Sequence, residues 1–254
     1  MIKLVFVNES CQNSAYLSEI EQNSSISEYL KRPRTSKIKK ERMLAYGGLF
    51  YLLSHLYNID YPIINFSGKP TLANNGTRPS FNLSHTDGAV VVAITEDYEQ
   101  VGVDIERLMP SEVSERIFKR FLFDKEDSLP SNRLGEETEI FTLYSHEGEL
   151  VLKKVQKTEN GKAYPTGESS DSHPSFRDGI TKIKRGDGGV YSVTEKYTLL
   201  ESVLKCEGGG FSSFTNYSEI KRGCECFSFW LRIKDKEYSL SLSCSGKKEN
   251  NNKN

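Results

Sequence analysis

Residues 81–106 read FNLSHTDGAVVVAITEDYEQVGVDIE, and this stretch decides the fold. Its apolar and β-branched residues predict strands at 82–85, 89–95 and 101–106. Between the first two strands, residues 86–88 read Thr-Asp-Gly, which is typical of a turn. Two successive chain reversals would return the third strand to the neighbourhood of the first. We therefore expect the polar residues at the ends of the first and third strands to lie close together.

Two acids end the third strand in the pattern D-I-E. Because side chains alternate along a strand, Asp104 and Glu106 are predicted to share one face, with Ile105 turned into the core. Neighbouring carboxylates repel each other unless a cation or protons lie between them, and their oxygens suit a hard divalent cation. The pattern therefore fits a metal site. An isolated D-x-E is equally the sequence of a strand end whose acids only reach solvent.

Residues that can bind phosphate precede the acid pair. Lys69 lies in a Gly-Lys-Pro sequence, and Ser84 and His85 close the first predicted strand. Charge-assisted hydrogen bonds from such groups hold phosphate oxygens well. A lone histidine is more often structural, but beside a lysine and two acids it indicates an anionic phosphate ligand.

Taken together, G-K-P at 68–70, F-N-L-S-H at 81–85 and V-G-V-D-I-E at 101–106 resemble the Sfp-type 4'-phosphopantetheinyl transferases. Those enzymes move the phosphopantetheine arm of coenzyme A onto a serine of a carrier protein. The resemblance implies an α+β fold of two similar α/β subdomains, here 1–104 and 105–245. These would be related by a pseudo-twofold axis and would hold coenzyme A in the cleft between them.

The same family carries the pattern W-[ST]-x-K-E-[AS]-x-x-K on a helix. Matching its E-x-x-x-K spacing selects Glu149 and Lys153, within a helix predicted over 137–155. Matching the Tyr-Ser pair at 144–145 to the first two positions instead brings Glu147 near the third acid slot. The choice between Glu149 and Glu147 therefore stays open. An i,i+4 pair shares one helix face and could address one ligand, although such pairs also simply stabilise helices.

The resemblance implies a role for each of these residues. Asp104, Glu106 and Glu149 would hold Mg²⁺ against the pyrophosphate of coenzyme A. Glu149 would accept the proton of the carrier serine, with Lys153 and His85 assisting catalysis. Contacts to the phosphates and to coenzyme A would come from Arg42, Lys69, Ser84, His85 and Lys153. The partner would be an apo acyl or peptidyl carrier protein of fatty acid, polyketide or nonribosomal peptide biosynthesis, and the by-product 3',5'-ADP.

The rest of the chain predicts further helices and strands. Helices are expected at about 36–57 and 111–123, and strands at 3–7, 190–205, 226–234 and 238–244. The second helix places Arg116, Lys119 and Arg120 on one side, where they would meet an acidic carrier protein. The stretch 156–189 is rich in Gly, Ser and Asp and predicts a long loop, and the tail 246–254 predicts disorder.

Composition excludes several function classes. The 254 residues carry a formal net charge of -1, which argues against bulk binding of nucleic acid. No apolar stretch approaches the roughly twenty residues of a membrane span, and the first residues are too briefly apolar for a secretory signal. We therefore expect a cytoplasmic protein, monomeric because one chain holds both halves of the cleft.

Five scattered cysteines argue against a disulfide framework, and Cys224-x-Cys226 lacks the second pair of a zinc site.

Two other functions remain open at the level of sequence. One is a coenzyme A-binding homologue without transferase activity, acting as an interaction or regulatory protein. The other is an unrelated metal-dependent phosphoesterase, which would need more His or Asp ligands than a chain with four histidines offers near the site.

Overall fold

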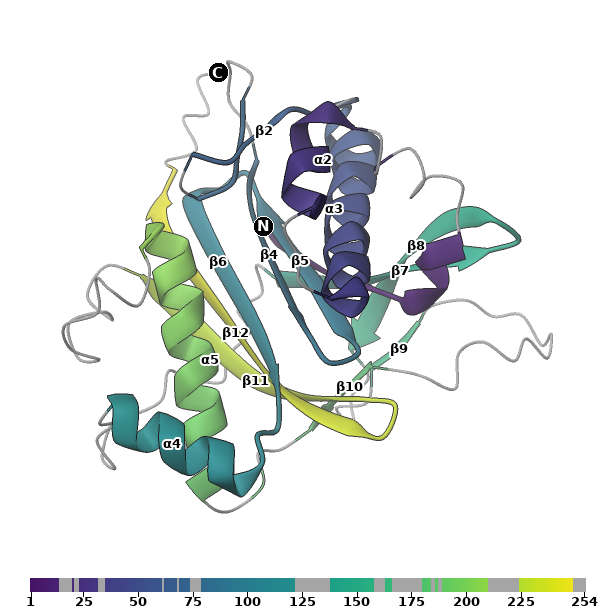
Figure 1. Ribbon diagram of the computed structural model, residues 1–254. Coiled ribbons are helices and arrows are strands. Elements are labelled where there is room, and N and C mark those ends of the chain that lie inside the picture. The colour runs from purple at the N-terminus through teal and green to yellow at the C-terminus, as the bar shows by residue number, and fades with distance from the viewer. Residues whose placement is uncertain are drawn as a thin grey trace.

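The structure is a computed structural model of the 254-residue chain. It describes residues 1–13, 20, 23–31, 35–60, 62–67, 69–73, 79–121, 138–157, 163–165, 180–183, 186, 189–209 and 224–248. Two sheets pack face to face, with the long helix α3 (Ser36–Tyr57) outside one sheet and α5 (Gly189–Glu207) outside the other (Figure 1). The chain is therefore a mixed α/β protein, as predicted.

The first sheet has six strands in the order β4-β5-β1-β7-β8-β9. Its strands are β4 (Ser80–Thr86), β5 (Ala89–Thr95), β1 (Ile2–Val7), β7 (Thr138–His146), β8 (Glu149–Lys157) and β9 (Ala163–Pro165). β1 runs antiparallel to β5 and parallel to β7, so the sheet is mixed. It joins strands from both predicted subdomains, and the proposed division at residue 104 stays a prediction.

The second sheet is antiparallel and has the order β10-β11-β12-β6. Its strands are β10 (Ile180–Ile183), β11 (Glu225–Ile233), β12 (Lys236–Lys247) and β6 (Tyr98–Arg107). Alternation along β12 separates the two faces: Leu240 and Leu242 enter the core between the sheets, whereas Ser241 and Ser243 are buried on the other face. Ser243 meets Ser202 of α5 at 2.7 Å between their hydroxyl oxygens. Small residues thus let α5 lie close to this sheet.

Gly102 on β6 makes the closest approach of α5 to the sheet. A Cβ atom at this position would lie 1.9 Å from the carbonyl oxygen of Ser202 and 2.4 Å from the amide nitrogen of Cys206. Only glycine leaves room for the helix backbone here. The glycine in V-G-V-D-I-E therefore brings the last turns of α5 onto the strand that carries the acid pair.

The two sheets meet where the edge strands β4 and β6 lie side by side. Backbone hydrogen bonds do not pair these strands in the sheet order; side chains of β4 accept the amide hydrogens of β6 instead. Asn82 Oδ1 accepts from Val103 N at 3.1 Å, and Ser84 Oγ accepts from Ile105 N at 3.3 Å. The alternate residues Phe81 and Leu83 face the core under α3. Polar and apolar residues therefore alternate in F-N-L-S-H, because one face of β4 meets β6 and the other faces the core.

Several predicted elements are confirmed. The helix predicted at 36–57 is α3, which Thr35 caps by accepting from Ile38 N at 3.3 Å. The helix predicted from 111 is α4 (Ser111–Phe121). The strands predicted at 3–7, 82–85, 89–95, 101–106, 226–234 and 238–244 correspond to β1, β4, β5, β6, β11 and β12. The shorter elements are η1 (Glu9–Asn13), α2 (Ser24–Lys31), β2 (Ile64–Asn65) and β3 (Thr71–Leu72).

Two predicted elements are wrong. The helix predicted over 137–155 is the hairpin β7–β8, whose turn residues Glu147 and Gly148 have φ of 52° and 88°. Consecutive positive φ angles make the two-residue turn that fits the twist of a hairpin. The strand predicted over 190–205 is the helix α5. This segment is 19 residues long, whereas a single strand rarely exceeds about ten residues.

The predicted loop and tail are only partly described. Within 156–189, the structure shows the strands β9 and β10, and the other predicted loop residues lie mostly outside the described part of the chain. The tail was predicted to begin at 246, but β12 continues to Lys247 and pairs with Tyr98 of β6. Residues 249–254 lie outside the described residues.

Candidate functional site

Asp104 is the most buried member of the acid pair, with a side chain only 2% exposed. As predicted, it lies on the face of β6 opposite to Ile105, which enters the core between the sheets. Its Oδ1 atom accepts from Ser84 Oγ at 2.8 Å and from Lys205 Nζ at 2.5 Å. Its Oδ2 atom is buried and has no hydrogen-bond partner among the described residues. One oxygen of this carboxylate is therefore left without a hydrogen bond within the described part of the protein.

Glu106 shares the face of Asp104, two residues further along β6. Its Oε2 atom accepts from Thr86 Oγ1 of β4 at 3.1 Å. Burial, followed by repulsion from Asp104 and Glu201, raises the pKa of Glu106 to about 8. Around neutral pH this carboxyl group is thus largely protonated, because the site holds more negative charge than its surroundings stabilise.

Helix α5 adds a third acid and a lysine to the pair. Lys205 Nζ lies 3.7 Å from Glu201 Oε2, one helical turn away, as well as forming the ion pair with Asp104. Burial raises the pKa of Glu201, and repulsion from Asp104 adds to the effect. For Lys205, burial alone lowers the pKa, but Asp104 and Glu201 more than reverse this and the net pKa is raised. Tyr197 Oη donates to Glu201 Oε1.

His85 faces the side of β4 opposite to Ser84, toward α3. Its Nδ1 atom lies 3.0 Å from Glu41 Oε2. Burial lowers the pKa of His85, the contact with Glu41 opposes this, and Arg42 and Lys205 lower it further. Arg42 stacks over the ring of Tyr29 with its guanidinium carbon 4.6 Å from the ring centre. The structure thus brings Arg42, His85 and Lys205 into one electrostatic neighbourhood.

Lys69 lies at the other end of the β6–α5 contact. Its Nζ atom donates to the carbonyl oxygens of Val101 and Cys206, both at 2.9 Å. Burial lowers the pKa of Lys69. The same lysine lines a cavity of about 360 Å³ together with residues of β4 and β6, including Phe81 and Gln100. In this structure Lys69 joins the last turn of α5 to β6, and its predicted contact with a phosphate stays a prediction.

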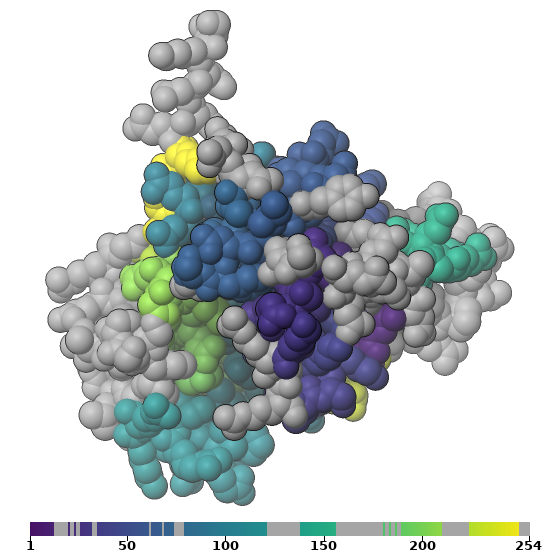
Figure 2. All heavy atoms as spheres, turned by 45° about the horizontal axis from the view of Figure 1, so that its top comes forward, coloured from purple at the N-terminus to yellow at the C-terminus, as the bar shows by residue number. Residues whose placement is uncertain are grey.

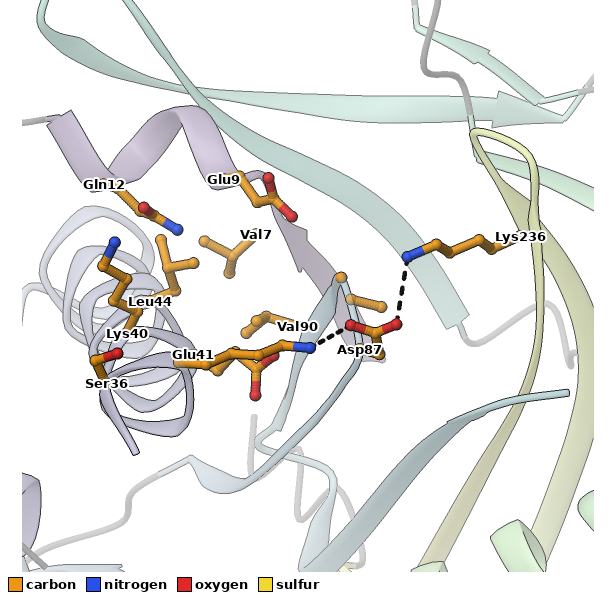
Figure 3. A pocket seen from close by; sticks show the side chains of 13 residues that line it. Val7, Glu9, Gln12, Ser36, Lys40, Glu41, Leu44, Asp87, Val90 and Lys236 are labelled. Atoms are coloured by element: carbon orange, nitrogen blue, oxygen red, sulfur yellow. Dashed lines mark hydrogen bonds and ion pairs between the residues drawn. The ribbon is translucent and has the colours of Figure 1, made fainter. Parts of the chain in front are cut away.

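A second cavity, of about 330 Å³, lies on the far side of Glu41 (Figure 3). Figure 3 shows Glu9 and Gln12 from η1 opposite Lys40 and Glu41 from α3, with Asp87 and Lys236 at one end. Asp87 forms ion pairs with Lys37, with Arg107 at 3.1 Å and with Lys236 at 3.4 Å. The hydrogen bond from Lys37 and then that from Lys236 lower the pKa of Asp87 to about 2. This network closes the β4–β5 turn against β11–β12.

The structure does not bring Glu149, Lys153 or Glu147 to the acid pair. Glu149 and Lys153 lie on β8, and Glu147 lies in the preceding turn. In the sheet order, β5, β1 and β7 separate β8 from β4, a distance of about 19 Å at roughly 4.8 Å per strand. The segment of Glu149 and Glu147 forms a hairpin rather than a helix beside β6, so the structure does not bring either residue to the third acid slot, and their predicted role stays a prediction.

A better match to the helix pattern lies in α5. Residues 197–205 read Y-T-L-L-E-S-V-L-K. Against W-[ST]-x-K-E-[AS]-x-x-K they place Thr198, Glu201, Ser202 and Lys205 in register. Tyr197 stands in the place of tryptophan, and Leu200 in the place of the first lysine. The strand that the apolar residues predict over 190–205 hides this match. The signal was present in the E-S-V-L-K spacing.

The acid cluster contains carboxylate oxygens, the ligands of a hard cation. Among the described residues, no three His, Cys, Asp or Glu side chains are arranged to hold a metal ion as they stand. Lys205 supplies the positive charge instead. Even so, the partnerless Asp104 Oδ2 and the raised pKa of Glu106 show that the site stabilises ionised carboxylates poorly as it stands. Three acids lie in this place, and carboxylate oxygens are the ligands that a hard divalent cation prefers.

No known family model matches this chain, and no curated protein matches it. Within the described residues, no helix is both long enough and apolar enough to cross a membrane.

Proposed function

We propose that this protein is a Mg²⁺-dependent 4'-phosphopantetheinyl transferase that modifies a serine of an apo carrier protein. One observation carries the proposal. Glu201 and Lys205 of α5 lie against Asp104 of β6, and both helix residues occupy the family positions in Y-T-L-L-E-S-V-L-K. Sequence spacing and three-dimensional proximity thus agree for three residues from two elements that are far apart in the chain.

The residues divide into metal ligands and phosphate contacts. Asp104, Glu106 and Glu201 would hold Mg²⁺, which when bound neutralises charge on the pyrophosphate of coenzyme A and on the departing 3',5'-ADP. Lys205 would then exchange its ion pair with Asp104 for a phosphate oxygen. His85 and Arg42 offer further donors from the α3 side of the junction.

Glu201 replaces Glu149 as the proposed proton acceptor for the carrier serine. Its pKa is raised by burial and by Asp104, which makes the carboxylate more basic than an ordinary glutamate. Tyr197 holds one of its oxygens, so the other can face the site. Attack of the serine oxygen on the β-phosphorus breaks the bond to the 3',5'-ADP oxygen, and the serine proton passes to Glu201.

The proposal also includes the internal symmetry of the fold. Each sheet is covered by one long helix, and the edge strands β4 and β6 meet at the acid cluster (Figure 1). This arrangement supports two similar α/β halves related by a pseudo-twofold axis. Coenzyme A would lie at their junction, between α3 and α5.

The test is a carrier-protein assay with matched glutamate variants. The full-length protein is incubated with coenzyme A, Mg²⁺ and each of several apo carrier proteins, and the mass of the carrier is followed. Glu201→Gln should reduce turnover by about 10²- to 10³-fold, as expected for a lost electrostatic group. Glu149→Gln, the same change on β8, should leave turnover unchanged. Equal activity of both variants, or a loss confined to Glu149→Gln, would refute the assignment.

A coenzyme A-binding homologue without transferase activity is the second candidate. Its specific support is the direct Lys205–Asp104 ion pair at 2.5 Å, together with the buried Leu200 in place of the family lysine. Coenzyme A binding measured by calorimetry, without modification of any carrier tested, would favour this function over the enzyme.

A further inference from the structure

Lys69 joins the two elements that carry the acid cluster. Its Nζ atom donates to the carbonyl oxygen of Val101 on β6 and to that of Cys206 on α5, at 2.9 Å in each case. Val101 lies shortly before Asp104 on its strand, and Cys206 directly follows Lys205 on its helix. The ammonium group therefore bridges β6 and α5 at residues that are close in sequence to both members of the buried ion pair.

The first acceptor lies on the edge of β6 that faces β4. One edge of β6 pairs with β12, and at the other edge Asn82 of β4 accepts from the amide of Val103. The N–H and C=O groups of every second residue in a strand point to the same edge, so the carbonyl group of Val101 shares this edge. A buried backbone carbonyl without a donor would lower the stability of the protein. Lys69 provides that donor.

The second acceptor belongs to the last turn of α5. The last carbonyl groups of a helix have no partner within the helix, and Cys206 is fully buried, so water does not reach it. The ammonium group of Lys69 provides the missing donor and also interacts favourably with the negative end of the helix dipole. Gly208 follows the helix with a φ of 74°, and a Cβ atom there would lie 3.6 Å from the Cβ atom of Lys69. The lysine stem therefore packs against the turn that ends α5.

We infer that Lys69 is a positioning residue, which fastens the last turn of α5 to β6 and thereby holds the acids and the lysine of the site together. The inference rests on the proposed transferase function, because Asp104, Glu201 and Lys205 form its site. It differs from the phosphate contact that the family resemblance implies for Lys69. In the inferred role, the ammonium group stays on its two carbonyl oxygens when coenzyme A binds.

The contact at Gly102 permits this arrangement but does not fasten it. Glycine leaves room for the backbone of α5 at Ser202 and Cys206, yet it has no side chain that could bind the helix. The bonds from Lys69 are charge-assisted and are therefore among the stronger hydrogen bonds of a protein. Their loss would let the end of α5 move away from β6, and a misplacement of about 1 Å at reacting groups can slow a reaction by about 10²-fold.

The first test is kinetic and uses the full-length protein in the carrier-protein assay. Lys69→Met keeps a stem of similar length and removes the ammonium group, so kcat should fall by about 10- to 100-fold. The KM for coenzyme A, and its Kd measured by calorimetry, should stay within about twofold of the values of the natural protein. Lys69→Arg can still donate to both carbonyl oxygens and should recover most of the lost kcat. A rise in the Kd and KM for coenzyme A with kcat unchanged would mean a phosphate contact and would overturn the inference.

The second test is hydrogen exchange followed by mass spectrometry, which does not depend on activity. In Lys69→Met, the amides in the last turn of α5 should exchange about tenfold faster than in the natural protein, whereas those in its first turns should be unchanged. Unchanged exchange in the last turn would contradict the inferred role. If the natural protein modifies no carrier, the proposed function fails, and the exchange result still decides whether Lys69 fastens the helix.

The control is Lys154→Met, the same change in an exposed lysine of β8 that pairs with Glu139. It should match the natural protein in kinetics and in exchange, because exposed ion pairs contribute little to stability. Circular dichroism checks that each variant is folded. If Lys69→Met does not fold, Lys69→Gln replaces it, because its amide group still provides a neutral donor. A fall in kcat at unchanged Kd is then expected, and equal effects of Lys69→Gln and Lys154→Met would refute the inference.

Discussion

Asp104, Glu106 and Glu201 are three acids in a space that provides one lysine as their counter-ion. The raised pKa values of Glu106 and Glu201 have a common origin, since burial penalises charge and each carboxylate repels the others. Such an arrangement destabilises the protein and is rarely found without a function. The loss of stability that these buried acids cause is therefore itself an indication of ligand binding.

The pH dependence of stability provides the first prediction. Glu106 has a pKa of about 8 in the folded protein, against an ordinary value of 4.5. The folded state therefore binds more protons than the unfolded state between these values, and stability falls as the pH rises from about 4.5 to about 8. Glu106→Gln removes this loss and should stabilise the protein at pH 9 by on the order of 2 kcal/mol.

Urea unfolding of both proteins at pH 5, 7 and 9 measures the difference. The two curves should approach each other at pH 5, where Glu106 is protonated in the folded protein. Excess Mg²⁺ should stabilise the natural protein at pH 8 more than the variant, because the cation favours the ionised carboxyl group. A gap between the proteins that does not grow with pH would argue against the buried, protonated Glu106.

Helix α5 can lie close to β6 because residue 102 is glycine. A helix pushed away from β6 would separate Lys205 from Asp104. In Gly102→Ala, the added methyl group would meet the backbone of α5 at Ser202 and Cys206. Backbone atoms cannot rotate away as a side chain can, so we expect a loss of stability of about 3 kcal/mol. Gly189→Ala, at the start of the same helix, meets no atom within 4 Å and should be nearly neutral. Equal unfolding midpoints for the two variants in urea would contradict this packing.

The β7–β8 hairpin can be distinguished from the predicted helix by a single substitution. Gly148 has a φ of 88° in the turn, a conformation that costs alanine about 1 kcal/mol. In a helix, the same Gly148→Ala change would stabilise by roughly as much. The sign of the change in unfolding free energy therefore decides between the two structures, and a more stable variant would favour the helix.

The whole molecule presents α4 and α5 along one flank, beside the N-terminal elements (Figure 2). Ile117 and Phe118 of α4 pack against α5, whereas Arg116, Lys119 and Arg120 are exposed. A cavity of about 530 Å³ opens between the two helices and has Phe118 and Lys119 in its wall. Lys119 and Glu115 both line this partly apolar depression, and Arg116 and Arg120 are exposed beside it on α4.

This flank is the expected docking surface for an acidic carrier protein. Lys119→Glu should raise the KM for the carrier by about tenfold through the reversed charge at the depression, with the KM for coenzyme A unchanged. Lys248→Glu makes the same charge change beyond the end of β12 and serves as the control. Steady-state kinetics with each substrate varied in turn provide both values. A parallel rise in both KM values would mean that Lys119 acts on the coenzyme A site instead.

Local patterns were sufficient for the parts of this protein whose structure follows from nearest neighbours. Alternation in F-N-L-S-H and V-G-V-D-I-E predicted both strands, the common face of Asp104 and Glu106, and the burial of Ile105. Helical spacing of the apolar residues likewise predicted the helix over 36–57, which is α3. These features depend on side-chain period and turn residues, which the sequence displays directly.

Tertiary contacts decided the rest, because strands and helices buried on most sides lose their distinguishing period. The apolar run in α5 is buried nearly all round and had been interpreted as a strand, and the 137–155 segment had been interpreted as a helix. Only the folded chain shows that Glu201 and Lys205, rather than Glu149 and Lys153, reach Asp104. The sequence alone determined two acids on one strand; the packing of α5 on Gly102 determined which residues complete the site.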